Sequence, residues 1–177
     1  MNILVLSGSP RKGGNTDLLV DAFVRGVGER HQITVVPVRE RNIHPCTGCN
    51  GCFVREDHRC VQNDDMQALY HQLAKCHMLV AASPVYFYGI SAQLKAVIDR
   101  LHTPLRETFP LQKLALLLVG ASTLPAVFDS INVQYQLILD YFHLENAGMV
   151  LASGVKDKGD ILSHPALEEA FRLGASL

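Results

Sequence analysis

The stretch from Ser7 to Thr16, with the sequence SGSPRKGGNT, combines residue types that hold a phosphate group. It lies between an apolar run at residues 2–6 and a segment from residue 17 with helical periodicity, which predicts a strand, a turn and a helix start. The first N–H groups of a helix have no partner within the helix, and the helix dipole adds partial positive charge there. Hydroxyl and amide side chains add hydrogen-bond donors, and Arg11 adds a planar guanidinium suited to phosphate. The stretch therefore predicts an anion site.

The spacing within this loop disfavours two common nucleotide motifs. A Walker A loop needs lysine and then serine or threonine where this chain has Gly14 and Asn15. A dinucleotide fingerprint reads G-x-G-x-x-G, and Ser9-Pro10 breaks that pattern. A single terminal phosphate, held by hydroxyls, an amide and backbone N–H groups, suits the loop better. An ordinary glycine-rich turn before a helix has the same composition, so both interpretations stay open for the loop alone.

Clustered cysteines form the second group of residues with chemical potential. Four of the five cysteines follow the spacing Cys46-x₂-Cys49-x₂-Cys52-x₇-Cys60. Three thiolates two residues apart on an irregular loop, with a fourth from farther along, suit a single [4Fe–4S] cluster. The same four thiolates, or three of them with His44 or His58, suit a structural zinc ion. Cys76 stands apart near the end of a predicted helix, where we expect a buried apolar thiol.

Composition limits the classes of function. With 177 residues, 48% of them hydrophobic, the chain is long enough for one compact domain spanning residues 1–177. Its 16 basic and 17 acidic side chains form no basic stripe, which disfavours nucleic acid as a partner. We find neither a membrane-spanning apolar run nor a signal peptide, and an odd number of cysteines does not suit a secreted disulfide framework. These features predict a cytoplasmic protein with metal or redox chemistry.

The predicted elements alternate between strands and helices. Strands are expected at 2–6, 33–38, 78–82, 114–120 and 147–153, and helices at 16–29, 66–76, 92–101, 125–143 and 165–173. Because most of these strands are apolar throughout, they predict a parallel sheet covered on both faces. The pattern fits a three-layer, flavodoxin-like α/β fold with five parallel strands in the order 2-1-3-4-5. In this fold a ligand lies beyond the carboxyl ends of the strands, at the loops 7–16, 83–91 and 120–125.

The second of these loops carries three consecutive aromatic residues, Tyr86 to Tyr88, directly after a strand. Alternate side chains of such a run must face solvent, which is unfavourable unless something flat covers them. A planar ligand would contact these rings and Val85 while backbone N–H groups meet its polar edge. Packing on neighbouring helices or on a partner subunit is the alternative. In the third loop, Ala121, Ser122 and Thr123 are small and suit a further contact.

The two best-defined motifs together resemble a known family. The chain is similar to the NAD(P)H-dependent FMN reductases of flavodoxin-like fold. The first matching motif is Gly8-Ser9-Pro10-Arg11 with Gly14-Asn15-Thr16. The second is Ser83-Pro84-Val85-Tyr86, followed by the run from Ser91 to Arg100. Within them the chain resembles the iron–sulfur flavoproteins, and the resemblance extends from residue 1 to about residue 155. It implies non-covalent FMN, with the phosphate on the first loop, the ring against residues 84–89 and the pyrimidine side near residues 121–123. The implied cofactor-binding residues are Ser9, Pro10, Arg11, Gly14, Asn15, Thr16, Pro84, Val85, Tyr86, Phe87, Tyr88, Gly89, Ala121, Ser122 and Thr123.

The cysteine spacing agrees with this resemblance. A bacterial ferredoxin motif places its fourth cysteine after three residues and follows it with proline, whereas Cys60 comes after seven and Val61 follows. Iron–sulfur flavoproteins have a compact motif that these four cysteines match. Some similar FMN reductases keep such cysteines as bare or disulfide-paired thiols, so cluster, zinc and free thiols all remain open.

Three functions follow from these patterns. The leading one is an oxidoreductase in which NAD(P)H reduces bound FMN, which then reduces a quinone, a nitro- or azo-aromatic compound or free flavin. The second is an electron carrier that uses FMN and a [4Fe–4S] cluster with a redox protein as partner. The third is a thiol- or metal-based sensor without flavin. Because the cofactor carries the chemistry, we assign no catalytic side chain, and the sequence does not indicate a preference for NADH or NADPH. A long apolar helix at 125–143 and the aromatic loop predict a homodimer or homotetramer.

Overall fold

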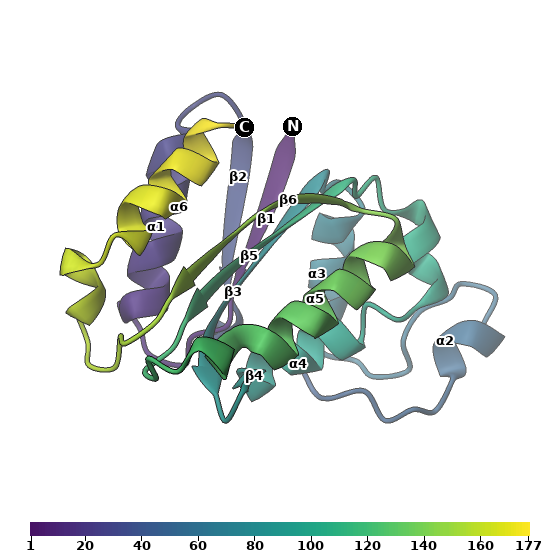
Figure 1. The fold of residues 1–177 in the computed structure, drawn as a ribbon. Helices are drawn as coiled ribbons and strands as arrows, with labels where there is room; N and C mark the ends of the chain where they lie inside the picture. The colour runs from purple at the N-terminus through teal and green to yellow at the C-terminus, as the bar shows by residue number, and fades with distance from the viewer.

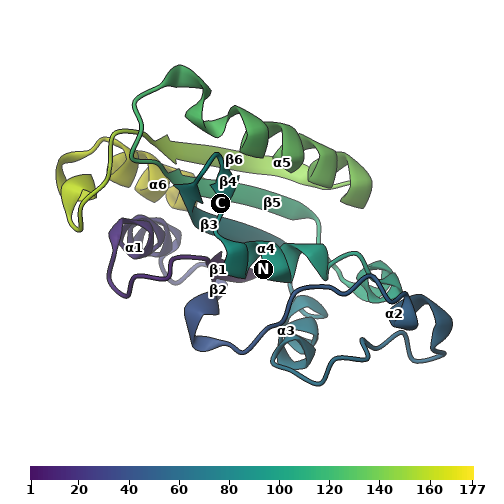
Figure 2. The ribbon, with the colours of Figure 1, turned by 90° about the horizontal axis from the view of Figure 1, so that it is seen from below.

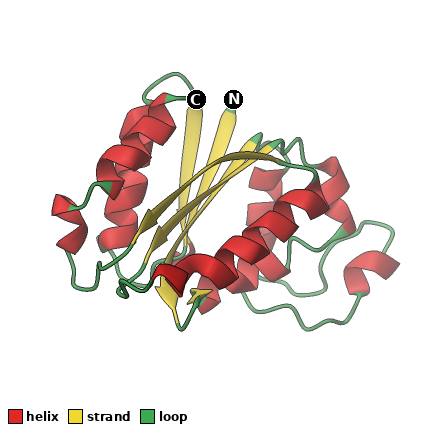
Figure 3. Ribbon diagram, viewed as in Figure 1, coloured by secondary structure: helices red, strands yellow, loops and turns green.

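The computed structural model describes residues 1–177, apart from the side chain of Pro125. A central sheet is covered by helices on both faces, which gives three layers (Figure 1, Figure 3). The strands are β1 (Asn2–Ser7), β2 (Gln32–Pro37), β3 (Met78–Tyr86), β4 (Gly89–Ile90), β5 (Lys113–Val119) and β6 (Glu145–Ala152). Five of them pair in parallel in the order β2-β1-β3-β5-β6, which confirms the predicted topology. The sixth, β4, is a two-residue addition that pairs antiparallel with β3.

The apolar strands explain the layered arrangement. Successive side chains of a strand point to opposite faces, so a strand with no polar alternation must be buried on both. In β1, Ile3 and Val5 pack into the core on one side of the sheet, while Leu4 and Leu6 pack into the core on the other. Proline at the end of β2 is tolerated because β2 forms one edge of the sheet.

The helices are α1 (Asn15–Val27), α2 (Gly51–Val54), α3 (Met66–Leu73), α4 (Ala92–Asp99), α5 (Asp129–Phe142) and α6 (Ala166–Ala175). Helices α1 and α6 cover one face, and α3, α4 and α5 cover the other (Figure 1, Figure 2). Where α1 and α6 meet, a Cβ on Gly26 would lie 2.0 Å from the Phe171 carbonyl oxygen, and one on Gly174 would lie 2.2 Å from the Phe23 carbonyl oxygen. Glycine at both positions is therefore what lets the two backbones approach this closely.

Several helix ends differ from the prediction by one to three residues, and one predicted helix is divided in two. The helix expected at 125–143 is divided into a 3₁₀ turn, Pro125–Phe128, and α5. The helix expected to reach Cys76 ends at Leu73, and further 3₁₀ turns lie at Val38–Glu40, Pro104–Thr108 and Asp160–Ser163. Within the described part of the chain, no helix combines the length and the apolar character needed to cross a bilayer.

Candidate functional site

A cavity of about 160 Å³ lies at the carboxyl end of the parallel strands. In Figure 1 the arrowheads of β5 and β6 point toward this lower edge of the sheet, and Figure 2 views the molecule from that side. Four segments line the cavity: the first loop (residues 7–16) with the start of α1, the end of β3, the end of β5 with the third loop (120–125), and a fourth loop (153–159) that follows β6. The lining residues are Ser9, Arg11, Gly14, Asn15, Thr16, Pro84, Val85, Tyr86, Val119, Ala121, Val155 and Lys156.

The first loop is held in shape by the carboxylate of Asp17, in the first turn of α1. One oxygen of this carboxylate accepts a hydrogen bond of 2.8 Å from the Gly13 N–H, and the other accepts one of 2.8 Å from the Ser7 hydroxyl. The Arg39 guanidinium, from the 3₁₀ turn after β2, lies 3.1 Å from the same group. Arg39 compensates the negative charge of Asp17. The loop therefore remains compatible with a bound anion even though a carboxylate shapes it.

The start of α1 presents donors to the cavity. Its N-cap residue is Gly14, whose lack of a side chain leaves the first turn without a side-chain cap. The N–H groups of that turn have no acceptor within the helix, and the helix dipole makes this end attractive to an anion. Ser9, Arg11 and Thr16 also line the cavity. This donor set suits a phosphate group.

Close packing joins the first loop to the second loop (83–91). A Cβ on Gly8 would lie 2.7 Å from the Leu94 Cβ and 2.9 Å from the Ser91 hydroxyl oxygen, so only glycine fits there. The Ser91 hydroxyl donates a 2.6 Å hydrogen bond to the Gly8 carbonyl and accepts one from the Leu94 N–H, which caps α4. Ser83 accepts a 2.9 Å hydrogen bond from the Ser91 N–H. These buried contacts fix the two loops relative to each other.

The aromatic part of the second loop forms the tight turn between β3 and β4. Phe87 and Tyr88 occupy this turn with φ of 47° and 64°, a left-handed conformation that is uncommon for aromatic residues. Phe87 is 97% exposed and Tyr88 about half-exposed, and their ring centroids lie 5.9 Å apart in an edge-on arrangement. Strained, exposed aromatic residues beside a cavity are typical of a contact surface for a ligand or partner.

The fourth loop was missed by the sequence analysis. Val155 and Lys156 line the cavity, together with Val119 at the end of β5. The Arg11 guanidinium donates to the Lys156 carbonyl over 3.3 Å, and the Val155 N–H donates to the Gly120 carbonyl over 2.9 Å. Nothing in its sequence marks this loop, because its place at the cavity depends on contacts with residues about 145 positions earlier, such as Arg11.

The predicted cofactor-binding residues thus divide into two groups. The cavity brings together Ser9, Arg11, Gly14, Asn15, Thr16, Pro84, Val85, Tyr86 and Ala121. Outside its lining lie Pro10, Phe87, Tyr88, Gly89, Ser122 and Thr123. The second group belongs to the rims of the same loops, so these residues could contact only a ligand that extends beyond the cavity.

The cysteine segment (residues 46–60) projects from the other side of the molecule, beyond α4 and α5 (Figure 1). Its neck, residues 42–45 and 62–65, is anchored by a buried ion pair between Arg100 and Asp64, whose side chains are 1% and 0% exposed. The Arg100 guanidinium also donates to the His44 carbonyl, and the His44 N–H donates to Asp64 over 2.9 Å. Burial alone would raise the pKa of Asp64, but Arg100 and the His44 N–H outweigh it and hold this pKa below its ordinary value.

The cysteines themselves are not gathered around a common point. Among the described residues, no set of three or more His, Cys, Asp or Glu side chains is arranged to hold a metal ion. Cys46 and Cys49 are exposed, while Cys52 and Cys60 are half-buried, and all are free thiols. Phe53 lies within the segment and contacts His102, with ring centroids 5.3 Å apart. By contrast Cys76 is buried as expected, and burial raises the pKa of its thiol to about 11.

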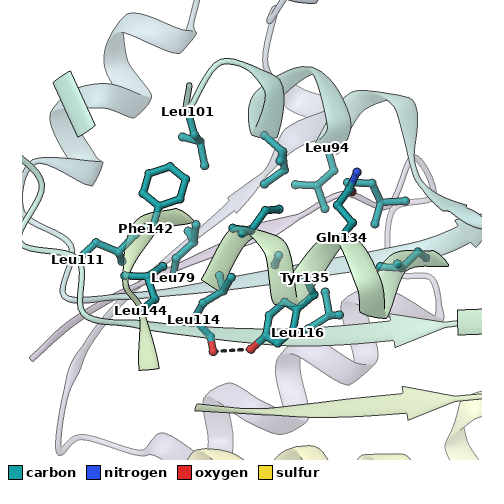
Figure 4. A pocket seen from close by; sticks show the side chains of 15 residues that line it. Leu79, Leu94, Leu101, Leu111, Leu114, Leu116, Gln134, Tyr135, Phe142 and Leu144 are labelled. Atoms are coloured by element: carbon teal, nitrogen blue, oxygen red, sulfur yellow. Dashed lines mark hydrogen bonds between the residues drawn. The ribbon is translucent and has the colours of Figure 1, made fainter. Parts of the chain in front are cut away.

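A second hollow lies under α5 and is unrelated to either motif. Figure 4 shows its lining, which includes Leu79, Leu94, Leu116 and Tyr135. Its volume of about 40 Å³ is close to that of one water molecule, and its walls are almost entirely apolar. The Tyr135 hydroxyl lies 2.7 Å from the Leu114 carbonyl oxygen, so this polar group is satisfied within the core. We interpret this hollow as a packing gap in the core.

Comparisons with known proteins connect this geometry to a family. A family model described as NADPH-dependent FMN reductase matches residues 1–155. An iron–sulfur flavoprotein of Methanosarcina thermophila is 33% identical over 172 residues, which cover 96% of this chain and 86% of that protein. A protein of Bacillus subtilis named as an NAD(P)H-dependent FMN-containing oxidoreductase is 32% identical over 183 residues, covering 98% of this chain and 96% of that one.

Two further comparisons extend this result. An iron–sulfur flavoprotein of Methanocaldococcus jannaschii is 36% identical over 113 residues; this match covers 63% of the present chain and 57% of that relative's length. The solved structure of an NAD(P)H:quinone oxidoreductase from Methanothermobacter marburgensis matches with a TM-score of 0.81, covering 99% of this chain and 98% of that one. At 18% sequence identity this match concerns the fold, and it confirms the flavodoxin-like architecture.

Proposed function

The chain belongs to the NADPH-dependent FMN reductase family, and from this premise we propose that it is an NAD(P)H-dependent oxidoreductase with FMN bound at the cavity. The observation that carries the proposal is the convergence of four segments on one cavity, which is lined both by phosphate donors of the first loop and by Pro84, Val85 and Tyr86. When bound, FMN accepts a hydride from NAD(P)H and passes electrons to a second acceptor such as a quinone, a nitro- or azo-aromatic compound or free flavin.

The residues of the chain would divide the work between the two ends of the cofactor. Ser9, Arg11, Thr16 and the N–H groups of the first turn of α1 would bind the phosphate. At about 160 Å³ the cavity is smaller than a typical pocket for a whole ligand of this size, so the ring would extend along the second loop. There Tyr86, Phe87 and Tyr88 would cover the ring and exclude water, and Ala121 to Thr123 would lie near its pyrimidine side. No side chain is needed to transfer a proton at the reacting atoms.

Flavin binding and nucleotide oxidation test this proposal separately. We expect saturating FMN to raise the melting temperature and to lose its fluorescence on binding, because a ligand that binds only the native state stabilises it. With FMN present, the protein should oxidise NADH or NADPH when a quinone or azo compound is added. If FMN leaves the melting temperature unchanged and its fluorescence is not quenched, the proposal is wrong.

A second candidate function is electron transfer between proteins through FMN and a [4Fe–4S] cluster. It is favoured by the four-cysteine spacing and by the relatives named as iron–sulfur flavoproteins. The described conformation of the cysteine segment does not bring its thiols together, so it fits a cluster only after the segment rearranges around it. Protein purified without oxygen should then be brown and contain iron and sulfide in near-equal amounts, whereas a colourless, iron-free preparation would exclude this function.

A homodimer or homotetramer is our proposal for the assembly. Of the apolar residues of α5, Ile131, Tyr135 and Leu139 pack into the core of their own subunit. Val133, Leu137 and Tyr141 form an exposed stripe at intervals of four residues along the outer face, beside a groove of about 330 Å³ between α4 and α5. A second copy of the chain would cover this stripe.

Light scattering after size exclusion tests the assembly. The wild-type protein should have at least twice the mass of the 19.5 kDa chain. Leu137→Glu should shift it to the monomer, while Gln136→Glu, which changes an exposed neighbour, should leave the mass unchanged. A wild-type mass of one chain would refute the proposal.

The compartment we propose is the cytoplasm. All five cysteines of the chain are free thiols, a state maintained by the reducing poise of that compartment. Thiol labelling of the protein in freshly lysed cells should therefore modify the exposed Cys46 and Cys49 without prior reduction, and labelling only after reduction would argue for an oxidising compartment.

A further inference from the structure

The side chain of Asn15 is occupied by the protein itself. Its Nδ2 donates a 2.7 Å hydrogen bond to the Asp157 carbonyl, and its Oδ1 accepts a 2.8 Å hydrogen bond from the Gly159 N–H. Asn15 is only 9% exposed, so it has little room to turn toward a ligand. Both atoms of the amide thus serve to attach the fourth loop to the start of α1.

Other contacts hold the same loop in place. Arg11 donates to the Lys156 carbonyl over 3.3 Å, and one carboxylate oxygen of Asp160 accepts hydrogen bonds from the N–H groups of Lys156 and Asp157, at 3.0 and 2.7 Å. With both sides of the loop attached, its backbone is fixed at the entrance of the cavity.

The fixed loop places an exposed lysine at the cavity. Lys156 lines the same cavity as Arg11 and Thr16. Among the described residues its ammonium group has no hydrogen-bond or ion-pair partner. The carboxylate of Asp17 lies in the same region, but it is paired with Arg39. An ammonium group left without a partner here is available to the negative charge of a bound phosphate.

From this geometry we propose that Asn15 is a positioning residue and that Lys156 selects a phosphate monoester. By fixing the fourth loop, Asn15 holds the Lys156 ammonium where the phosphate of the cofactor lies, so that the site discriminates FMN from riboflavin. This inference rests on the proposed function. The family match ends at residue 155, so the selecting side chain lies just beyond the part of the chain that the match covers.

Titration of FMN and of riboflavin, followed by quenching of flavin fluorescence at low ionic strength, tests the proposal. The proteins are the wild type, Lys156→Ala, Asn15→Ala, the double variant, and Lys158→Ala as the matched control. Lys158 belongs to the same loop and carries the same charge, but it lies outside the cavity lining, with its ammonium 3.5 Å from the Lys12 carbonyl oxygen.

We expect Lys156→Ala to weaken FMN binding about tenfold, the usual size of a charge-assisted contact that is partly screened by solvent. Riboflavin affinity should stay the same, because riboflavin has no phosphate. Asn15→Ala should reduce FMN affinity by a similar factor, and the double variant should bind FMN no more weakly than Asn15→Ala alone. Lys158→Ala should bind FMN like the wild type.

Several results would overturn the inference. Equal losses for FMN and riboflavin in Lys156→Ala would show that the residue does not recognise phosphate, and losses that multiply in the double variant would show that Asn15 contacts the phosphate itself. A tenfold loss of FMN affinity in Lys158→Ala would show that the total positive charge of the loop, rather than Lys156 itself, favours the phosphate. Lys156 is exposed, so its variant tests the proposal even if Asn15→Ala fails to fold. A wild-type protein that melts cooperatively but binds neither flavin would instead refute the proposed function.

Discussion

The first loop and the cysteine segment are both short, polar stretches with a recognisable spacing, yet their functional groups are held very differently. In the first loop, Asp17 fixes the backbone through hydrogen bonds to Ser7 and Gly13. Ser91 and Asn15 join this loop to residues that are distant in sequence. In the cysteine segment the buried Arg100–Asp64 pair fixes the neck, while the four thiols remain apart and two of them are exposed. The difference indicates that the proposed phosphate site is ordered without its ligand, whereas the proposed cluster site would have to be organised by the cluster.

Substitutions in the neck should have the largest effect on the free energy of unfolding. Arg100→Met should lower the free energy of unfolding by about 3 kcal/mol or more, because it leaves the carboxylate of Asp64 buried and unpaired. The matched control is Arg55→Met, which breaks the exposed pair with Asp57 inside the segment and should change stability little. Urea unfolding monitored by circular dichroism measures both. A small effect of Arg100→Met would mean that the neck is as loosely held as the thiols.

Glycines in the two regions provide the next test. Gly8→Ala should cost about 1–3 kcal/mol of stability and weaken FMN binding, because the new Cβ would overlap Leu94 and Ser91. Gly48 has φ of +66° and no atom within 4 Å of an added Cβ, so Gly48→Ala should cost only the roughly 1 kcal/mol of a left-handed alanine and leave FMN binding intact. Denaturant unfolding and FMN titration of both variants provide the comparison. Equal effects on FMN binding would contradict the view that only the first loop is a preformed site.

Acid should weaken the neck of the cysteine segment. The pKa of Asp64 is lowered in the folded protein, so its ionisation contributes stability at every pH above about 4 and that contribution is lost as the pH falls through the lowered value. Wild-type protein should therefore lose more stability between pH 5 and pH 3 than Asp64→Asn does. Thermal unfolding at a series of pH values measures this difference, and parallel curves for the two proteins would show that Asp64 does not contribute.

Substitutions of the exposed cysteines should have the smallest effect on stability. The double substitution Cys46→Ser, Cys49→Ser changes two exposed side chains whose hydrogen bonds stay within their own loop, and serine can replace them. The melting temperature of metal-free protein should therefore stay within experimental error. The same variant prepared without oxygen and with iron should lack any cluster. A metal-free variant that melts several degrees lower than the wild type would show that these two thiols stabilise the cysteine segment, contrary to this prediction.

Local patterns were sufficient for most of the fold. Apolar runs and helical periodicity predicted the five parallel strands and their order, because a strand such as β1 must be buried on both faces. The antiparallel strand β4 was not predicted, since it depends on Phe87 and Tyr88 adopting a turn that their side chains disfavour. The split of the helix at 125–143 likewise has no clear local signal.

The candidate site was only partly predictable, for a related reason. Glycine, serine and arginine within one short loop predict an anion site without knowledge of the fold. The contributions of Ser9, Arg11 and Thr16 to the cavity could therefore be anticipated. Lys156 reaches the cavity through contacts that span the whole chain, and the pairing of Asp64 with Arg100 is equally distant in sequence. The cysteine spacing describes which thiols could meet, but it does not determine whether the backbone brings them together.

The attachment of Asn15 to the loop at Asp157 and Gly159 also orders events during synthesis on the ribosome. The first loop leaves the ribosome early, but the residues that hold Asn15 are made more than 140 positions later, and α6, which packs against α1, follows them. At a typical rate of translation this interval is roughly 7–30 seconds. The nascent chain therefore carries its glycine-rich loop without the contacts of Asn15 for that time, and we expect flavin to bind only after residues 157–159 have joined the fold.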